Sequence, residues 1–498
     1  MMILRKAAYI LFVAILMVAG VVAIVLYRTV NVAYEIPDVE AVHYEDIPLD
    51  DAVKHLSAAI RHQTISTQSQ PSPYRDQFDA FIDFVREAFP LIHEHLDLKV
   101  INGYTLLYKW EGSRPDMPAA MMQGHYDVVP VEPGTYDNWT HPPFEGVVSD
   151  GFVWGRGAID DKSGIFSYLE SITYLLERGY EPERTLYVAL NHDEEVGGRQ
   201  GARKVADYLL ENDIPIKFLV DEGMPVVEKI MEGLEHPIAM IGVAEKGYLS
   251  IELEVNMEGG HSSMPPRETT IGALSEAITN LKKQPMQGRI PGLLRETFDP
   301  LLPDLPFVYR IGLSNLWLFG GVIEERLGYI PHTNAALRTT IAPTMFHAGI
   351  KENVLPQTAN AIINFRIHPN DNIREVLYYV QSTIDNDLID VRVLDGAREP
   401  SPVTSTASEA YKLMKHTIHE TFPGIPVAPA MFLAATDSRH FTEVTDYLLR
   451  FRPIRARPDD RGRIHGTDER ISVDNYGEMI AFYIRFIKNA TSGSPATE

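Results

Sequence analysis

The chain has 498 residues, 45% of them apolar, and a formal net charge of −23 at pH 7. This length is enough for about two to four domains with substantial cores. The acidic balance argues against a nucleic-acid partner, because phosphate binding requires a basic face. Cysteine is absent, which excludes disulfides, thiolate ligands and a cysteine nucleophile. Any metal ion must therefore be held by histidine and carboxylate side chains.

The N-terminal segment from Ala7 to Tyr27 is apolar and uncharged, with Arg5 and Lys6 before it and Arg28 after it. A helix of about 21 residues can span the roughly 30 Å core of a bilayer. The flanking charges predict a membrane anchor with the rest of the chain outside the cytoplasm, periplasmic or extracellular. Two alternatives stay open: a cleaved signal, which would leave a secreted protein, and a buried core helix.

The anchor or signal comprises residues 1–28. A polar, acidic linker follows over residues 29–50, and helical periodicity begins near Asp51. The stretch Leu98–Trp110 alternates as a strand. Three apolar runs resemble buried parallel strands and are separated by helical patterns: Ala119–Met122, Leu186–Leu190 and Phe218–Val220. Strands that alternate with helices predict an α/β fold, with a mostly parallel sheet sandwiched by helices.

A different pattern begins near Gly247 and predicts a smaller α+β unit. Its elements are two alternating strands and two helices: Tyr248–Val255, Ala359–Ile367, Thr270–Lys283 and Ile373–Ile384. We therefore predict that residues 247–398 form a lid or dimerisation domain, inserted between catalytic segments 51–246 and 399–490. An apolar, Leu- and Pro-rich stretch, Ile290–Ile330, lies within this insertion.

Polar residues follow each of the three buried strands. They are His125 and Asp127 after the first, His192, Asp193, Glu194 and Glu195 after the second, and Asp221 and Glu222 after the third. In an open α/β sheet, ligands bind outside the carboxyl ends of the strands. These side chains are therefore expected to converge on one edge of the sheet and to form a site there.

A site that holds two divalent ions needs about four ligands for each ion, and one carboxylate can bridge them. The candidates are His125, Asp160, Glu195, Asp221 and His465. Each has an ordinary explanation when taken alone, since Asp160, for example, could cap the helix that follows it. Together, in a chain without cysteine, the five residues leave a metal site and separate structural roles equally open.

Four motifs occur in order along the chain: GHYDVVP at 124–130, GRGAIDDK at 155–162, HDEE at 192–195 and VDEG at 220–223. They resemble the aminoacylase and carboxypeptidase S family of dinuclear zinc metallopeptidases, metallopeptidase family twenty. Four further phrases look most like the branch of N-fatty-acyl-amino-acid synthase/hydrolases, with carboxypeptidase S as its neighbour: AEKG at 244–247, GHSS at 260–263, NFRIHP at 364–369 and TDSR at 436–439.

The resemblance implies one metal ion held by His125, Asp160 and Asp221, and a second held by Asp160, Glu195 and His465. Asp160 is then the bridge between the two ions. Zinc is the metal expected from the family, although mixed histidine and carboxylate sites also accept manganese or cobalt.

The remaining site residues are also assigned by resemblance. Asp127 would accept the free N–H of the His125 imidazole. Glu194, adjacent to the ligand Glu195 but free of the metal, would be the general base that takes a proton from the water and returns it to the leaving amine. His261 would stabilise the oxyanion, and in dimeric members this histidine reaches the partner subunit.

Asn353 and Arg366 match the pair that binds the substrate carboxylate, which an arginine can do with two hydrogen bonds. The family often has glycines before the Thr-Asp motif, whereas Ala434 and Ala435 precede Thr436 here. A run of arginines precedes His465 and is interpreted as a solvated strand and loop: Arg450, Arg452, Arg455, Arg457, Arg461 and Arg463.

The expected function is metal-dependent hydrolysis, with reversible synthesis, of the amide bond of small-molecule N-acyl amino acids. Apolar acyl chains are favoured, partly because the stretch Ile290–Ile330 could wall an acyl channel. One alternative is a carboxypeptidase that releases C-terminal amino acids from short peptides. Another is a binding ectodomain that keeps a peptidase fold without catalysis. A homodimer is also open.

Overall fold

The computed structural model describes residues 2–68, 73–229, 234, 236–288 and 292–493. It divides into two units, each built from two segments of the chain. The larger unit comprises residues 36–245 and 401–498, and the smaller comprises residues 1–35 and 246–400.

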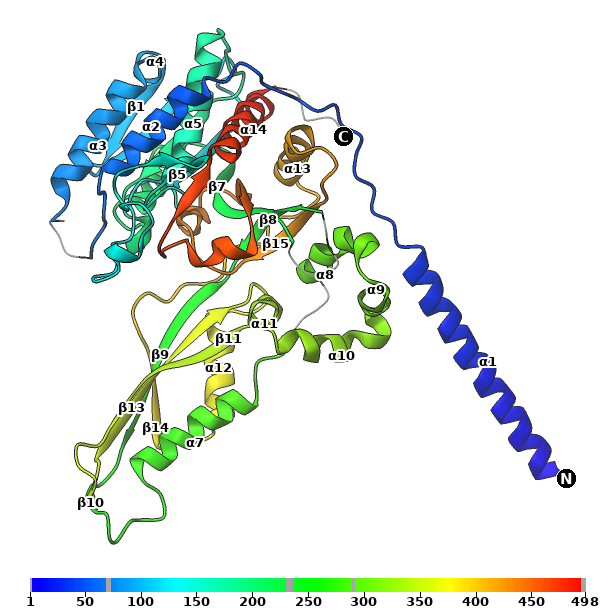
Figure 1. Cartoon of the computed structure of the whole chain (residues 1–498). Helices are drawn as coiled ribbons and strands as arrows, with labels where there is room; N and C mark the ends of the chain where they lie inside the picture. Colours follow the sequence, from blue (N-terminus) through cyan, green and yellow to red (C-terminus); the bar gives the residue numbers. More distant parts are fainter. Residues whose placement is uncertain (1, 69–72, 230–233, 235, 289–291, 494–498) are drawn as a thin grey trace. The chain divides into compact units, whose positions relative to one another are not determined.

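An eight-stranded mixed sheet forms the centre of the larger unit, in the order β1-β2-β6-β3-β7-β16-β8-β15 (Figure 1). Its strands are β1 (Asp97–Ile101), β2 (Thr105–Trp110), β3 (Ala119–His125), β6 (Leu186–Asn191), β7 (Ile216–Val227), β8 (Ile238–Glu245), β15 (Val427–Phe432) and β16 (Leu448–Ala456). β3 pairs in parallel with β6 and β7, β7 with β16, and β8 with β15. The predicted α/β class is thus confirmed.

The central strands lack alternation because both faces of the sheet are covered. Every residue of β3 and of β6 is buried, which is typical of strands between two helical layers. Towards the edge, the predicted single strand Leu98–Trp110 is instead a hairpin of β1 and β2. It turns at Asn102 and Gly103, whose φ angles of 49° and 87° lie in the left-handed region.

Helices pack on both faces of this sheet. Residues of α6 share a core with Met121 and Leu219, whereas Ile165 of α5 approaches Gly124 on the opposite face. The helices of this unit are α2 (Leu49–Arg61), α3 (Arg75–Ala88), α4 (Pro90–His95), α5 (Lys162–Glu177), α6 (Ala202–Glu211), α13 (Glu409–Thr421) and α14 (Val473–Thr491). Short 3-10 turns are η1 (Tyr136–Asn138), η2 (Glu194–Val196), η4 (Asp437–Phe441) and η5 (Pro458–Gly462). A three-stranded sheet comprises β4 (Val148–Ser149), β5 (Phe152–Trp154) and β17 (Arg470–Ser472).

The smaller unit is built on a four-stranded antiparallel sheet of order β11-β13-β9-β14. Its strands are β9 (Gly247–Asn256), β11 (Thr340–Ala348), β13 (Thr358–Ile367) and β14 (Ile389–Val393). α7 (Thr270–Lys283) and α12 (Ile373–Ile384) have the predicted bounds, and they share a core with β9 and β13. A two-stranded ribbon joins β10 (Gly260–His261) to β12 (Val354–Leu355).

The apolar stretch of the smaller unit is helical. It contains α8 (Leu293–Phe298), η3 (Asp299–Asp304), α9 (Phe307–Ser314), α10 (Leu316–Gly328) and α11 (Pro331–Leu337). Its first two residues, 290 and 291, lie outside the described residues. The N-terminal helix α1 (Met2–Val30) belongs to the same unit. In the described part of the chain, α1 is the one helix long and apolar enough to cross a membrane.

Candidate metal centre

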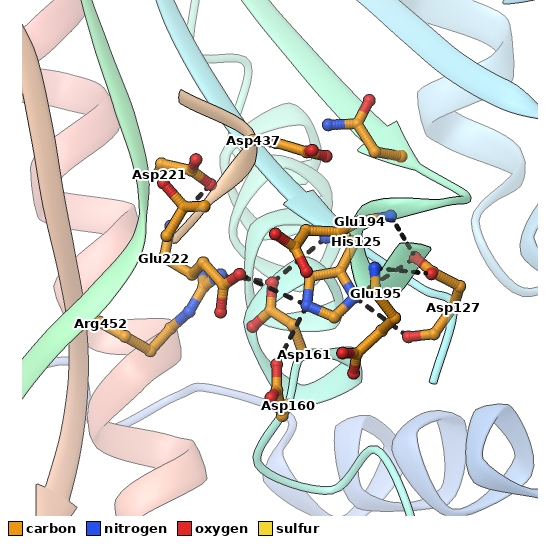
Figure 2. Close-up of polar contacts among 12 residues, drawn as sticks. His125, Asp127, Asp160, Asp161, Glu194, Glu195, Asp221, Glu222, Asp437 and Arg452 are labelled. Carbon is orange, nitrogen blue, oxygen red and sulfur yellow. Dashed lines mark hydrogen bonds and ion pairs between the residues drawn. The ribbon is translucent and has the colours of Figure 1, made fainter. Parts of the chain in front are cut away.

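The candidate ligands lie in the larger unit, on strands of the central sheet or on the segments that follow them. His125 ends β3, Glu195 lies in η2 after β6, and Glu222 lies within β7. Asp160 lies just before α5, and His465 lies in a turn after η5, where its φ is 60°. Figure 2 shows His125 among the carboxylates of this group.

Two clusters of possible metal ligands share Asp160: His125 with Asp160 and Glu222, and Asp160 with Glu195 and His465. His125 Nε2 lies 3.0 Å from Asp160 Oδ1 and 3.4 Å from Glu222 Oε1. His465 Nε2 lies 3.0 Å from Asp160 Oδ2 and 3.2 Å from Glu195 Oε2. Asp160 therefore turns one oxygen towards each cluster, which is the arrangement of a bridging ligand.

The charges of these groups fit divalent cations. Burial raises the pKa of Glu195 to about 7, although a hydrogen bond from His465 opposes the shift. Hydrogen bonds with Asp160 and Glu195 raise the pKa of His465 to about 10. Glu195 Oε1 is buried and has no hydrogen-bond partner among the described residues. The donor set of two histidines and three carboxylates, with one oxygen unused, suits hard or borderline ions such as zinc.

At one position the structure differs from the ligand set implied by resemblance. Glu222, not Asp221, is grouped with His125 and Asp160. The Asp221 carboxylate already accepts hydrogen bonds from Gln123 Nε2 at 2.9 Å, from the Ser438 backbone N–H at 2.7 Å and from the Glu222 backbone N–H at 2.8 Å. Strand β7 is irregular at this point, because Arg450 pairs with Asp221 and the next pair joins Phe451 to Met224. The hydrogen bonds of Asp221 also support the loops around the cluster, and its role as a metal ligand stays a prediction.

Asp127 holds two parts of the site at once (Figure 2). His125 Nδ1 lies 3.0 Å from the Asp127 backbone oxygen and 3.4 Å from its Oδ1. The Asp127 carboxylate also accepts the backbone N–H groups of Glu194 and Glu195, each at 3.1 Å. An Nδ1–H donor would leave His125 Nε2 free to bind a metal. Asp127 therefore orients the imidazole and fixes the turn that carries both glutamates.

Glu194 lies beside the cluster without belonging to either ligand group. Its Oε1 lies 3.5 Å from Arg439 Nη2, and the Asp437 carboxylate is nearby (Figure 2). Burial, and then the charge of Asp437, raise the pKa of Glu194 well above its usual value. A carboxylate in this state can accept a proton and hold it, as a general base that becomes a general acid must do.

A buried ion pair missed from the sequence connects the site to α5. Arg452 Nη2 lies 2.5 Å from Asp161 Oδ2, and its Nη1 donates to the hydroxyl groups of Tyr168 and Tyr483. The adjoining Asp160–Asp161 peptide bond is cis. A Cβ at Gly164 would meet Arg452 Cζ at 2.2 Å, so only glycine allows this approach. Since Arg450 and Arg452 are fully buried, the interpretation of this run as solvated is wrong for both residues.

A second buried pair connects the loops that carry Asp160 and His465. Arg156 Nη1 lies 2.6 Å from Glu469 Oε2, and Arg156 Nη2 donates to the backbone oxygens of His465 and Gly466 at 3.1 Å. Glu469 Oε1 accepts the backbone N–H of Asp160 at 3.1 Å. These contacts hold the loop of Asp160 and the loop of His465 next to each other. The GRG motif pointed to this loop, but the partner lies 313 residues away.

A pocket of about 880 Å³ opens over the cluster. Its lining includes Asp160, Glu194, Glu195 and His465, together with Ala434 and Ala435. The volume is within the range of sites for small organic ligands. A substrate of this size therefore has room beside the ligands and Glu194.

The three predicted residues of the smaller unit fall in two places. His261 on β10 pairs with Val354, and the Asn353 backbone oxygen accepts the N–H of Ser262, so His261 and Asn353 are neighbours. Arg366 lies near the other end of β13, opposite Tyr248, with its guanidinium 5.1 Å from the tyrosine ring centroid. Along β13, the separation from Thr358 to Arg366 is about 27 Å at a strand rise of about 3.4 Å per residue.

Comparison with known proteins identifies the family of this chain. The model of peptidase family M20/M25/M40 matches residues 121–489. An N-fatty-acyl-amino acid synthase/hydrolase of Mus musculus is 40% identical over 441 residues, covering 87% of this chain and 87% of that protein. A probable carboxypeptidase S-like protein of Dictyostelium discoideum is 38% identical over 483 residues, covering 94% of this chain and 92% of the relative.

Among solved structures, an M20 family metallo-carboxypeptidase from Sulfolobus solfataricus has the same fold at 19% identity. The TM-score is 0.62, and the match covers 88% of this chain and 99% of that chain. Human carnosine dipeptidase 1 is similar at 16% identity, with a TM-score of 0.60 and a coverage of 90% of this chain and 97% of that chain. Since the family model matches well over half of the sequence, the chain belongs to peptidase family M20/M25/M40.

Proposed function

We propose that this protein hydrolyses, and in reverse synthesises, the amide bond of N-acyl amino acids with apolar acyl chains, using two metal ions. The observation that carries the proposal is the position of Asp160, which turns one carboxylate oxygen to each of two ligand clusters with Glu194 beside them. The acyl preference is supported by the relative from Mus musculus, which is named as an N-fatty-acyl-amino acid synthase/hydrolase.

The residues that would hold the ions are His125, Asp160 and Glu222 for one, and Asp160, Glu195 and His465 for the other. When bound, zinc or a similar ion lowers the pKa of a water molecule and polarises the amide carbonyl. Glu194 takes a proton from the attacking water on its carboxylate and delivers that proton to the leaving nitrogen. Arg439 keeps the Glu194 side chain in place while the proton is transferred.

We also propose that His261 stabilises the oxyanion and that Asn353 and Arg366 bind the substrate carboxylate. An arginine suits this task because its fixed charge and paired N–H groups match a carboxylate. His261 and Asn353 lie together, whereas Arg366 lies near the other end of the sheet. A homodimer would supply the two groups from different copies, and a monomer of full activity would contradict this arrangement.

The proposed location is a membrane, with α1 as the anchor and the catalytic unit outside the cytoplasm. The support is the apolar span Arg5–Val30 together with the basic residues at its start. A signal peptide has the same composition over part of its length, so the alternative product is a secreted enzyme. N-terminal sequencing of the mature protein distinguishes the anchor from a cleaved signal.

The competing function is a carboxypeptidase of short peptides, which the relative from Dictyostelium discoideum favours by its name. Both reactions cleave an amide next to a free carboxylate, so they differ only in the acyl side. We therefore compare kcat/KM for oleoyl-phenylalanine with that for a blocked dipeptide that ends in phenylalanine. The proposal expects the acyl substrate to be preferred, and a strong preference for the dipeptide would refute it.

A further inference from the structure

The helices α9 and α10 expose several large apolar side chains on the smaller unit. The exposed fractions are 49% for Phe307, 79% for Val308, 53% for Tyr309, 53% for Trp317, 45% for Leu318 and 60% for Val322. We call these six residues the apolar face. Single exposed apolar residues are normal, but a group of this kind on adjoining helices marks an interaction surface.

Charged residues are absent from the segment that carries half of this face. From Ile311 to Ile323 the sequence holds no charged side chain. The charges that bound the segment are engaged within the unit: Arg310 donates to the Leu305 backbone oxygen at 2.9 Å, and Glu324 lies 3.3 Å from Arg338. The surface of a soluble domain normally intersperses charges here. An apolar rather than a charged partner is therefore expected.

The same helices pack against the C-terminal end of α1. Asn315, between α9 and α10, is fully buried, and its Nδ2 lies 3.3 Å from the Val25 backbone oxygen and 3.1 Å from Thr29 Oγ1. Val25 and Thr29 are themselves buried, at 8% and 0% exposure, although the apolar window of α1 is otherwise open. Figure 1 shows α9 beside this end of α1. The apolar face is thus continuous with the candidate membrane span.

Helix length places this contact at a membrane surface. The span Arg5–Val30 has 26 residues, so at about 1.5 Å per residue it exceeds the roughly 30 Å of a hydrocarbon core. Its last turns, with Val25 and Thr29, then lie at the interface on the far side from Arg5. Tryptophan and tyrosine are enriched at that depth, and the face carries Trp317 and Tyr309.

We infer that the apolar face of α9 and α10 docks into the surface of the bilayer that α1 spans. The inference rests on the proposed anchor and goes beyond the proposed chemistry of the metal centre. The occupant of the face is the headgroup and upper acyl region of the lipid, where apolar amphiphiles also partition. The smaller unit is therefore held against the membrane and not only tethered to it.

The tryptophans of the chain provide the test. The sequence has four, of which Trp110, Trp139 and Trp154 are buried at 5%, 8% and 4% exposure, and Trp317 is 53% exposed. The full chain is reconstituted into phosphatidylcholine vesicles with or without bromine on the acyl chains. Brominated lipid should quench the fluorescence of Trp317 and leave that of the three buried tryptophans. The Trp317→Phe variant should therefore show no quenching by brominated lipid.

A charge on the face provides a second variant. Val322→Asp should reduce the quenching by brominated lipid, while Val148→Asp, at a valine that is 50% exposed in the larger unit, should leave it unchanged. Val148→Asp should hydrolyse a water-soluble N-acyl amino acid at the wild-type rate in detergent, and both variants should keep the circular dichroism spectrum of the wild type. Loss of that activity in the unmodified protein would contradict the proposed function without bearing on docking.

Four results would overturn the inference. One is unchanged Trp317 emission in brominated vesicles together with equal acrylamide quenching in vesicles and detergent. Another is protection of Trp317 in detergent that grows with protein concentration, which would identify a second copy as the occupant. Protection of Trp317 in detergent by an added N-acyl amino acid would assign the face to substrate. Failure of the chain to be retained in vesicles would remove the anchor on which docking depends.

Discussion

Two adjacent carboxylates in β7 are expected to respond in opposite ways to substitution. Asp221 accepts three hydrogen bonds, from Gln123 Nε2, Ser438 N–H and Glu222 N–H. Hydrogen bonds to a charged group contribute about 1.5–3 kcal/mol each, and an asparagine leaves at least one of these donors facing an amide. Asp221→Asn should therefore lower the free energy of unfolding by about 2–5 kcal/mol, with or without metal.

Glu222→Gln should behave differently in metal-free protein. Burial raises the pKa of Glu222, and although His125 opposes the shift, the charge of Asp160 adds to it, so a neutral side chain of the same shape costs little. We expect its free energy of unfolding without metal to equal or exceed that of the wild type. With metal at 100 times its Kd, each ion stabilises the fold by about 2.7 kcal/mol, and Glu222→Gln should lose about one such increment.

The assay is chemical denaturation in detergent, with a chelator or with zinc, combined with metal analysis. The expected contents at saturating zinc are two ions for Asp221→Asn and fewer than two for Glu222→Gln. The reverse pattern, in which Asp221→Asn loses an ion and Glu222→Gln keeps both at wild-type affinity, would refute the assignment of Glu222 and restore Asp221 as the ligand.

Three further changes test other parts of the structure. Burial lowers the pKa of His419 to about 4, and neither ring nitrogen has a hydrogen-bond partner among the described residues. The folded state therefore favours neutral His419, so its contribution to the free energy of unfolding is fully present above pH ~6.5 and is lost as the pH falls towards 4. Compared with His419→Phe, the wild type should lose on the order of 2–3 kcal/mol over this range by denaturation, and equal losses would contradict the shift. Gly164→Ala should cost about 1–3 kcal/mol of stability, because the added methyl group meets Arg452, and a more stable variant would show that the arginine can move. Arg156→Lys should weaken binding of one ion by about 10–100-fold in a zinc titration, since lysine cannot contact both Glu469 and the His465 turn, whereas the exposed Arg203→Lys should bind as the wild type.

Local patterns were sufficient for much of the fold. The strands β3 and β6 have continuous apolar runs, and α7 and α12 have amphipathic periodicity with clear ends, so their existence could be predicted. The hairpin of β1 and β2 was missed, although the Asn102-Gly103 pair at its turn is a hairpin signal. β8 was also missed, although its first seven residues are an apolar run and all eight are buried.

The site, like the fold, was predictable from the sequence only in part. The residues at strand ends were visible in the sequence, because parallel strands bring their carboxyl ends to one edge. The hydrogen bonds that hold the Asp221 carboxylate were not, since one of them comes from the Ser438 N–H, 217 residues away. Likewise, the burial of Arg452 depends on Asp161, which lies 291 residues earlier. Contacts of this range leave no periodic signal in the sequence.

The most direct test of the central claim is the Glu194→Gln variant, measured for bound metal and for turnover in the same preparation. Because Glu194 lies beside both ligand clusters and belongs to neither, the variant should bind two ions per chain, as the wild type should. Its kcat for an N-acyl amino acid should fall by about 10²–10⁴-fold, the usual contribution of a general base. A variant with both ions and wild-type turnover, or a wild type that is fully active without metal, would contradict the account.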